Sequence, residues 1–265
     1  TTPCNTLFDK LSKMEQIIDS LIDMEREKNI RILYACETGS RAWGFPSPDS
    51  DYDVRFIYMH ERDWYLSLSQ RKDTIEYMEE DLDITGWDLK KCLTLLKKSN
   101  VPLIERFQSP IEYCAVPGFK VGFKQLIESY YSPTAVFFHH YSLANKFWQD
   151  IKDKEEYKLK SFFYLVRSLL SCNWILQDKS VLPMHIEGLL QYTDEKMKNR
   201  LRELIQRKAG VGEKYLHSKD IQMNKWIEGL FKRLEVSKQN LGVNEMDMSL
   251  LNDFFLKMVY AKVDN

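Results

Sequence analysis

Residues 39–57 read GSRAWGFPSPDSDYDVRFI, and the interpretation of the whole sequence starts from this stretch. Gly39-Ser40 forms a turn after a short apolar segment, and ten residues separate it from Asp51-Tyr52-Asp53, which opens another apolar segment. Glycine lets the backbone approach a phosphate closely. Two carboxylates at alternate positions of a strand share one face and can hold a divalent metal ion against that phosphate. The stretch therefore predicts a site for a metal ion and a nucleotide.

An isolated Asp-x-Asp pair has a simpler explanation, a solvent-facing turn that closes a hairpin. The Gly-Ser turn at the correct distance upstream favours the metal site. A third carboxylate is expected from a neighbouring strand, and Asp83 fits because apolar Leu82 and Ile84 flank it. Its rivals are Asp81, which belongs to an acidic run, and Asp88, which suits the N-cap of the following helix. We therefore prefer Asp83.

Composition indicates an ordinary globular protein. The chain has 265 residues, of which 44% are hydrophobic and 29% charged. No apolar run is long enough to cross a membrane, and the first residues lack the order of a secretory signal. The five cysteines are scattered without a C-x-x-C pair, which argues against a disulfide scaffold and a structural zinc site. We expect a cytoplasmic protein with reduced, mostly buried cysteines and no membrane partner.

The charges are distributed unevenly along the chain. Residues 1–150 carry 18 Lys and Arg against 23 Asp and Glu, whereas residues 151–240 carry 18 against 12. An acidic first part suits metal binding, and a mildly basic second part can help to hold a polyanion. The excess is too small to indicate a nucleic-acid interface by itself, and solvated helix faces account for most of those lysines.

Periodicity divides the chain into two parts. The first part has helical spacing over 6–29 and 88–99, and it has strand character over 30–36, 52–59, 74–79 and 82–87. The second part has no comparable strand, and its predicted helices cover 133–151, 157–178, 194–208, 219–239 and 249–262. We predict an α+β fold: a catalytic domain with a small mixed sheet over 1–115, followed by an all-helical substrate-binding domain over 116–265.

The motif and its surroundings resemble a known superfamily. Gly39-Ser40, Asp51-x-Asp53 and the strand acid Asp83 together resemble the signature of the DNA polymerase β-like nucleotidyltransferases. The longer motif, GSRAWG followed by SDYDVR, resembles that of the bacterial and phage family of predicted nucleotidyltransferases assigned to RNA repair. The segment WDLKK over 87–91 and two later residues, Asn100 and Glu105, also look like that family. The resemblance is strong over 30–110 and looser beyond.

The resemblance implies a reaction and its metal ligands. Such enzymes transfer a nucleoside monophosphate from an NTP to a hydroxyl group and release pyrophosphate. By position, Asp51 and Asp53 would hold two Mg²⁺ ions, with Mn²⁺ as an alternative. Asp83 would share the catalytic metal and help to activate the attacking hydroxyl.

The same resemblance implies the phosphate contacts. Gly39 and Ser40 would bind the β- and γ-phosphates through backbone N–H groups and the serine hydroxyl. Arg41 would add a charged contact to the triphosphate, and an exposed loop arginine is the equally weighted alternative.

The helical part adds a second set of candidates. Lys160, Tyr164 and Arg167 recur at helical spacing and so share one face, from which the two cations would reach the triphosphate or an RNA end. The alternative is a solvated face with internal ion pairs. His139 and His140 point about 100° apart on a helix, so we expect packing or surface roles. The aromatic residues of this part are expected to be mostly core, with one or two stacking on a base.

Three functions remain open at this point. The leading one is Mg²⁺-dependent nucleotidyl transfer from an NTP to an RNA 3′ end. The second keeps the chemistry and changes the acceptor to a small molecule or a protein hydroxyl. The third is a catalytically inactive nucleotide-binding module, which a missing third acid would mark. The sequence leaves the oligomeric state open.

Overall fold

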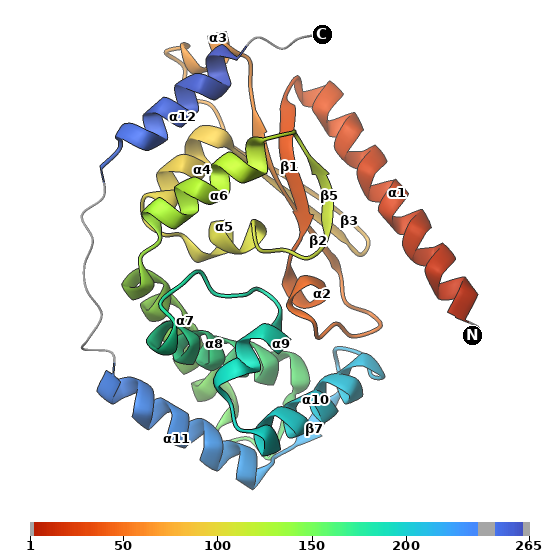
Figure 1. The fold of residues 1–265 in the computed structure, drawn as a ribbon. Helices are drawn as coiled ribbons and strands as arrows, with labels where there is room; N and C mark the ends of the chain where they lie inside the picture. The colour runs from red at the N-terminus through yellow and green to blue at the C-terminus, as the bar shows by residue number, and fades with distance from the viewer. Residues whose placement is uncertain (1–2, 238–246, 262–265) are drawn as a thin grey trace.

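A five-stranded mixed sheet forms the centre of the N-terminal half (Figure 1). The computed structural model describes residues 3–237 and 247–261, with side chains from residue 12 onward. The strand order is β3-β4-β2-β1-β5; β2 and β4 run parallel, and the other neighbours are antiparallel. The strands are β1 (Arg31–Glu37), β2 (Tyr52–Met59), β3 (Thr74–Glu79), β4 (Leu82–Asp88) and β5 (Glu112–Ala115).

Helices cover both faces of this sheet (Figure 1). The long helix α1 (Pro3–Lys28) lies along one face, where Ile17 and Leu21 join a core cluster with Val54, Phe56 and Ile84. The opposite face is covered by α4 (Leu89–Leu96), α5 (Val101–Arg106) and α6 (Phe119–Tyr130). Alternation along β2 and β4 therefore sends one set of side chains under α1 and the other set towards the helical half.

Two short helices, α2 (Gly39–Trp43) and α3 (Arg62–Tyr65), lie within the first half and follow β1 and β2.

The C-terminal half is built mainly from helices. The later elements are α7 (Pro133–Ile151), α8 (Leu159–Gln177), α9 (Ile186–Leu189), the 3-10 helix η1 (Leu190–Tyr192), α10 (Glu195–Ala209), α11 (Ile221–Ser237) and α12 (Ser249–Tyr260). Two three-residue strands, β6 (Glu156–Lys158) and β7 (Leu216–Ser218), pair antiparallel within this half.

The predicted α+β fold is confirmed. The structure also contains several mostly short elements that the sequence pattern did not predict. The four predicted strands and the long helices appear within a few residues of their expected bounds. Residues 238–239 and 262, which two predicted helices include, lie outside the described residues. The pattern missed β5, the β6–β7 pair, helices α2, α3, α5, α6 and α9, and the 3-10 helix η1. Asn100 accepts a hydrogen bond from the Leu103 N–H and caps α5.

One apolar core joins the two halves. The cluster that begins with Leu33 on β1 continues through α8 to Leu251 on α12. Phe107, at the end of α5, stacks on Phe123 of α6 with ring centroids 4.3 Å apart. Contacts therefore cross residue 115 continuously, while the division into domains at that residue stays a prediction.

The structure also bears on the expectations of reduced, mostly buried cysteines and of no membrane-spanning segment. Cys36, Cys92 and Cys172 are buried and Cys114 is partly buried, and all four are free thiols; the side chain of Cys4 lies outside the described residues. Within residues 3–237 and 247–261, no helix is both long and apolar enough to pass through a bilayer.

Candidate active site

The turn after β1 brings backbone and carboxylate into contact. Gly39 begins α2 with a φ of +62°, a conformation that glycine adopts without steric cost. A Cβ atom on Gly39 would lie 2.0 Å from Oδ2 of Asp53. The backbone N–H and the hydroxyl of Thr38 both donate to the carbonyl of Asp53, at 2.8 and 3.0 Å. The Gly-Ser turn and the first residues of β2 are therefore fastened together, and only glycine fits.

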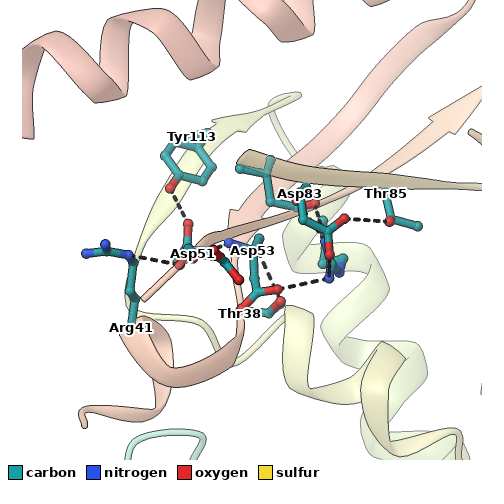
Figure 2. A network of polar contacts seen from close by, with 10 residues as sticks. Thr38, Arg41, Asp51, Asp53, Asp83, Thr85 and Tyr113 are labelled. Carbon is teal, nitrogen blue, oxygen red and sulfur yellow. Dashed lines mark hydrogen bonds and ion pairs between the residues drawn. The ribbon is translucent and has the colours of Figure 1, made fainter. Parts of the chain in front are cut away.

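Two predicted metal ligands face each other across parallel strands. The register of β2 and β4 sets Asp53 opposite Asp83, and Figure 2 shows their side chains on the same side of the sheet. Arg55 follows on that face, and its Nη2 lies 3.1 Å from Oδ1 of Asp53 and 2.7 Å from Oδ2 of Asp83. The hydroxyl of Thr85 donates to Asp83 at 3.4 Å. A protein-borne cation thus lies between the two carboxylates.

The electrostatics of Asp53 favour a cation. Burial raises the pKa of Asp53 above its usual value, and the charges of Asp83 and Asp51 raise it further. The charges of Arg55 and Lys160 act in the opposite direction and lower that pKa. Positive charge at this point therefore stabilises the ionised carboxylate.

Asp51 lies apart from this pair. It is exposed and precedes β2, and its carbonyl accepts a hydrogen bond from Nε of Arg41 at 3.0 Å. In the described part of the chain, no three His, Cys, Asp or Glu side chains gather closely enough to form a metal site. A site that uses Asp51, Asp53 and Asp83 together therefore requires these carboxylates to move closer to one another.

Arg41 is engaged with the loop that precedes β2. Its Nη2 donates to the carbonyl of Ser50 at 2.6 Å, and its guanidinium carbon lies 3.8 Å from the centre of the Tyr52 ring. These contacts close the loop between α2 and β2, as Figure 2 shows for the bond from Arg41.

A hydrogen-bonded chain links Ser40 to Lys160. The hydroxyl of buried Ser40 donates to that of Ser50 at 3.1 Å, and Ser50 donates to Oε1 of Glu213 at 3.0 Å. Oε2 of Glu213 accepts from Nζ of Lys160 at 2.6 Å. Burial lowers the pKa of Lys160, but the hydrogen bond and charge of Glu213 outweigh it, so the net shift is upward. One carboxylate thus holds two predicted phosphate contacts in place.

Glu37 is a site residue that the sequence analysis missed. It is buried at the end of β1, accepts a hydrogen bond from the Asp53 N–H at 2.7 Å, and accepts another from the hydroxyl of Tyr113 (Figure 2). Burial raises the pKa of Glu37 to about 7. The signal was an acid at the end of an apolar strand, directly before the Gly-Ser turn. Glu213 had no comparable signal, because its partner Ser50 is 163 residues away.

Arg167 of α8 is held by contacts inside the protein. Arg167 is buried, forms an ion pair with Glu105 at 2.7 Å and donates to the carbonyl of Met184 at 3.1 and 3.3 Å. Its guanidinium carbon lies 4.5 Å from the ring centre of Trp43, and Tyr164 meets the same ring edge-on. Arg167 therefore has the internal carboxylate partner that one of the two alternatives expected, but it is buried and does not lie on a solvated helix face.

A cavity of about 530 Å³ opens beside the acidic pair. Its lining includes Gly39 and Asp53 from the first half and Tyr164 and Arg167 of α8. Its volume lies within the range usual for small-molecule sites, about 300–1,000 Å³. The structure thus joins Gly39, Asp53, Tyr164 and Arg167 around one space.

Two comparisons relate the whole chain to known proteins. The model of the RNA repair pathway DNA polymerase beta family matches residues 14–257. The chain is also 36% identical over 249 residues to a protein of Bacillus subtilis (strain 168) recorded as uncharacterized protein YcgL. That match covers 92% of this chain and 96% of the Bacillus protein.

Proposed function

The chain belongs to the RNA repair pathway DNA polymerase beta family, and from this premise we propose that it transfers a nucleoside monophosphate from an NTP to a hydroxyl group at an RNA 3′ end. Pyrophosphate is the second product. One observation carries the proposal: Gly39 touches the carboxylate of Asp53, which lies opposite Asp83 across β2 and β4. A backbone that admits a phosphate therefore meets a carboxylate pair that attracts cations.

The donor set fits the metal ions that this reaction uses. Hard cations such as Mg²⁺ and Mn²⁺ prefer carboxylate oxygens, and the guanidinium of Arg55 already stands in for a cation between Asp53 and Asp83. Asp51, Asp53 and Asp83 would hold two Mg²⁺ ions, which when bound would neutralise charge on the transferring phosphoryl group. Arg55 has to leave the pair to admit them, since its Nη2 occupies the space between the two carboxylates.

The chain's own residues would orient the triphosphate. Gly39 and Ser40 would offer a backbone N–H and a hydroxyl to the phosphates, and Lys160 would add positive charge. This role of Lys160 is supported by its influence on the pKa of Asp53, which requires proximity. Arg41 donates to two backbone carbonyls and Arg167 is buried against Glu105, so we assign them to shaping the loop and α8 behind the phosphates. Lys160 is more accessible, with its side chain 39% exposed, and would exchange Glu213 for a phosphate.

Transfer of label from α-labelled NTPs tests the proposal. With Mg²⁺ and an RNA acceptor, Asp51→Ala, Asp53→Ala and Asp83→Asn should each lower the rate by about a hundredfold or more, as loss of charge stabilisation does elsewhere. Asp81→Asn is the matched control, because Asp81 lies two residues from Asp83 and pairs with Lys13 at the surface. Undiminished transfer by Asp51→Ala and Asp53→Ala would exclude this mechanism.

The fate of the label identifies the acceptor. Each NTP is incubated with wild-type protein and, in separate reactions, with RNA, with small hydroxyl compounds and with protein acceptors. Label on the RNA 3′ end supports the proposal, whereas label on a small molecule or a protein would replace the acceptor. Label on none of them, with NTP still bound, would indicate a catalytically inactive nucleotide-binding module.

A further inference from the structure

The cavity beside the acidic pair extends well beyond it. Its lining also includes His139, His140 and Leu143 of α7. The part beside Gly39 and Asp53, which we call the near end, suits phosphate and metal ions, as described above. The part beside α7, which we call the His140 end, has no role in that description.

Unpartnered polar atoms concentrate around this cavity. Among the described residues, six buried side-chain nitrogen or oxygen atoms have no hydrogen-bond partner, and three of them belong to two residues that line it. They are both ring nitrogens of His140 and Nε1 of Trp43. The side chain of His140 is almost fully buried, with 1% exposure. Buried polar groups are normally paired, and an exception needs an explanation such as a ligand.

The ring of His140 is uncharged. Burial, together with the charges of Arg167 and His139, lowers the pKa of His140 well below its usual value. The ring is therefore neutral at pH 7 and offers one donor and one acceptor. Arg167 is neutralised by Glu105, and Arg106 lies 3.6 Å over the ring of Trp87. A phosphate would find no unengaged cation among these lining residues.

Aromatic surfaces complete the lining. Trp43, Trp87 and Tyr164 contribute indole and phenol rings, and apolar Val101 and Leu143 fill the space between polar groups. Flat rings stack on planar heterocycles, and this interaction supplies much of the affinity of proteins for bases. The combination suits a neutral, planar ligand with both donors and acceptors on its edge.

We propose that the His140 end of this cavity binds a nucleobase, through hydrogen bonds from His140 and Trp43 and stacking on the aromatic lining. The proposal rests on the proposed function, since Gly39 and Asp53 at the near end would hold the phosphates of the same nucleotide. The base belongs to the NTP or to the terminal nucleotide of the RNA acceptor, and both present the same chemistry.

Binding measurements on the whole chain test this assignment. His140→Leu removes both hydrogen-bonding atoms and should weaken NTP binding about tenfold, while the affinity for inorganic triphosphate, which has no base, stays unchanged. His140→Gln keeps a donor and an acceptor and should recover part of the loss. Trp43→Phe should weaken binding several-fold. Trp174→Phe is its matched control, because Trp174 also has a buried, unpartnered Nε1 but lies outside the cavity.

The two sources of the base give different results. Loss of affinity for NTPs assigns the base to the donor nucleotide. Unchanged NTP affinity with weakened binding of a short RNA, dependent on its terminal base, assigns it to the acceptor. Unchanged affinity for both ligands in folded His140→Leu overturns the proposal.

A measurement on wild-type protein covers the case in which a variant fails to fold. In protein labelled with ¹⁵N-histidine, adding an NTP or the RNA should shift the ring signals of His140 and leave in place those of His60 and His217, which do not line the cavity. Unmoved His140 signals at saturating ligand would contradict the proposal. Base-dependent binding without transfer of label would refute the proposed function and leave this inference standing. Transfer of label without any effect of His140 on binding would support the proposed function and refute this inference.

Discussion

Gly39 shows how much one position decides at the scale of the residue. Its φ of +62° and its contact with Asp53 both require the absence of a side chain. Gly118, at the start of α6, has a similar φ of +79°, yet a Cβ there would meet nothing within 4 Å. A side chain at Gly118 would introduce backbone strain alone, whereas a side chain at Gly39 would introduce both backbone strain and a steric clash.

Gly39→Ala and Gly118→Ala should differ sharply. Gly118→Ala should lower the free energy of unfolding by about 1 kcal/mol, the cost of a left-handed backbone. Gly39→Ala should lower it by about 2–4 kcal/mol, because displacement of the Asp53 carboxylate adds to that strain. Urea unfolding measures both, and nucleotide transfer should fall only for Gly39→Ala. Equal losses of stability would show that the contact with Asp53 contributes nothing.

The residues predicted from sequence are those whose signals are local. Gly39, Asp53 and Asp83 were found because glycine before a strand and acids at alternate strand positions follow from backbone geometry. The role of Arg55 depends on the register between β2 and β4, which no local pattern contains. Glu213 depends on a contact between distant parts of the chain.

Helix α8 joins the two halves at the scale of the element. Arg167 and Glu105 form an ion pair in which the side chains are 5% and 12% exposed. Removing one partner leaves a buried charge without its counter-ion, which costs about 3–5 kcal/mol, whereas removing both restores much of the loss.

A double-mutant cycle tests this pairing. Arg167→Met and Glu105→Leu should each destabilise the protein, and the double variant should be more stable than the sum of the two losses predicts, by about 2 kcal/mol. Urea unfolding gives the four free energies, and additive losses would contradict the pairing. If the folded double variant binds NTP as wild type does, Arg167 makes no phosphate contact.

Element lengths explain which parts of the fold were predicted. Long helices such as α7 and α10 repeat their apolar spacing over several turns, so the pattern is strong. Strand β5 has four residues, too few to show alternation. Helix α6 has apolar residues at helical spacing, but it follows Pro117-Gly118, which indicated a boundary, and Gly122 weakens its helix propensity.

The continuous core is the dominant feature at the scale of the whole molecule. Phe119 and Phe123 of α6 cover Phe107, and Phe254 of α12 contacts both of them. The contacts with Phe107 cross the predicted boundary, since Phe107 precedes residue 115 and its partners follow it. The boundary was predicted from the sequence pattern. Which part of the chain can fold alone depends instead on how its side chains pack.

Two fragments test where the first half ends. Residues 1–131 include α6 and should unfold cooperatively in urea, with near-ultraviolet circular dichroism from ordered aromatic rings. Residues 1–115 lack α6 and expose Phe107, so they should show a weaker signal and a broader transition. Equal cooperativity of the two fragments would support a boundary at residue 115 and contradict this expectation.

The position of Arg55 has a consequence for how the acidic pair responds to its surroundings. Because the Arg55 guanidinium already offsets one of the two negative charges of Asp53 and Asp83, a cation that enters between them would have to displace it. Occupancy then follows the rules of ion exchange, in which the incoming ion competes with a tethered one at fixed local concentration. Under the proposed function, Arg55 would keep the two carboxylates partly neutralised when divalent cations are scarce, and the pair would bind a metal ion only at a concentration high enough to displace Arg55.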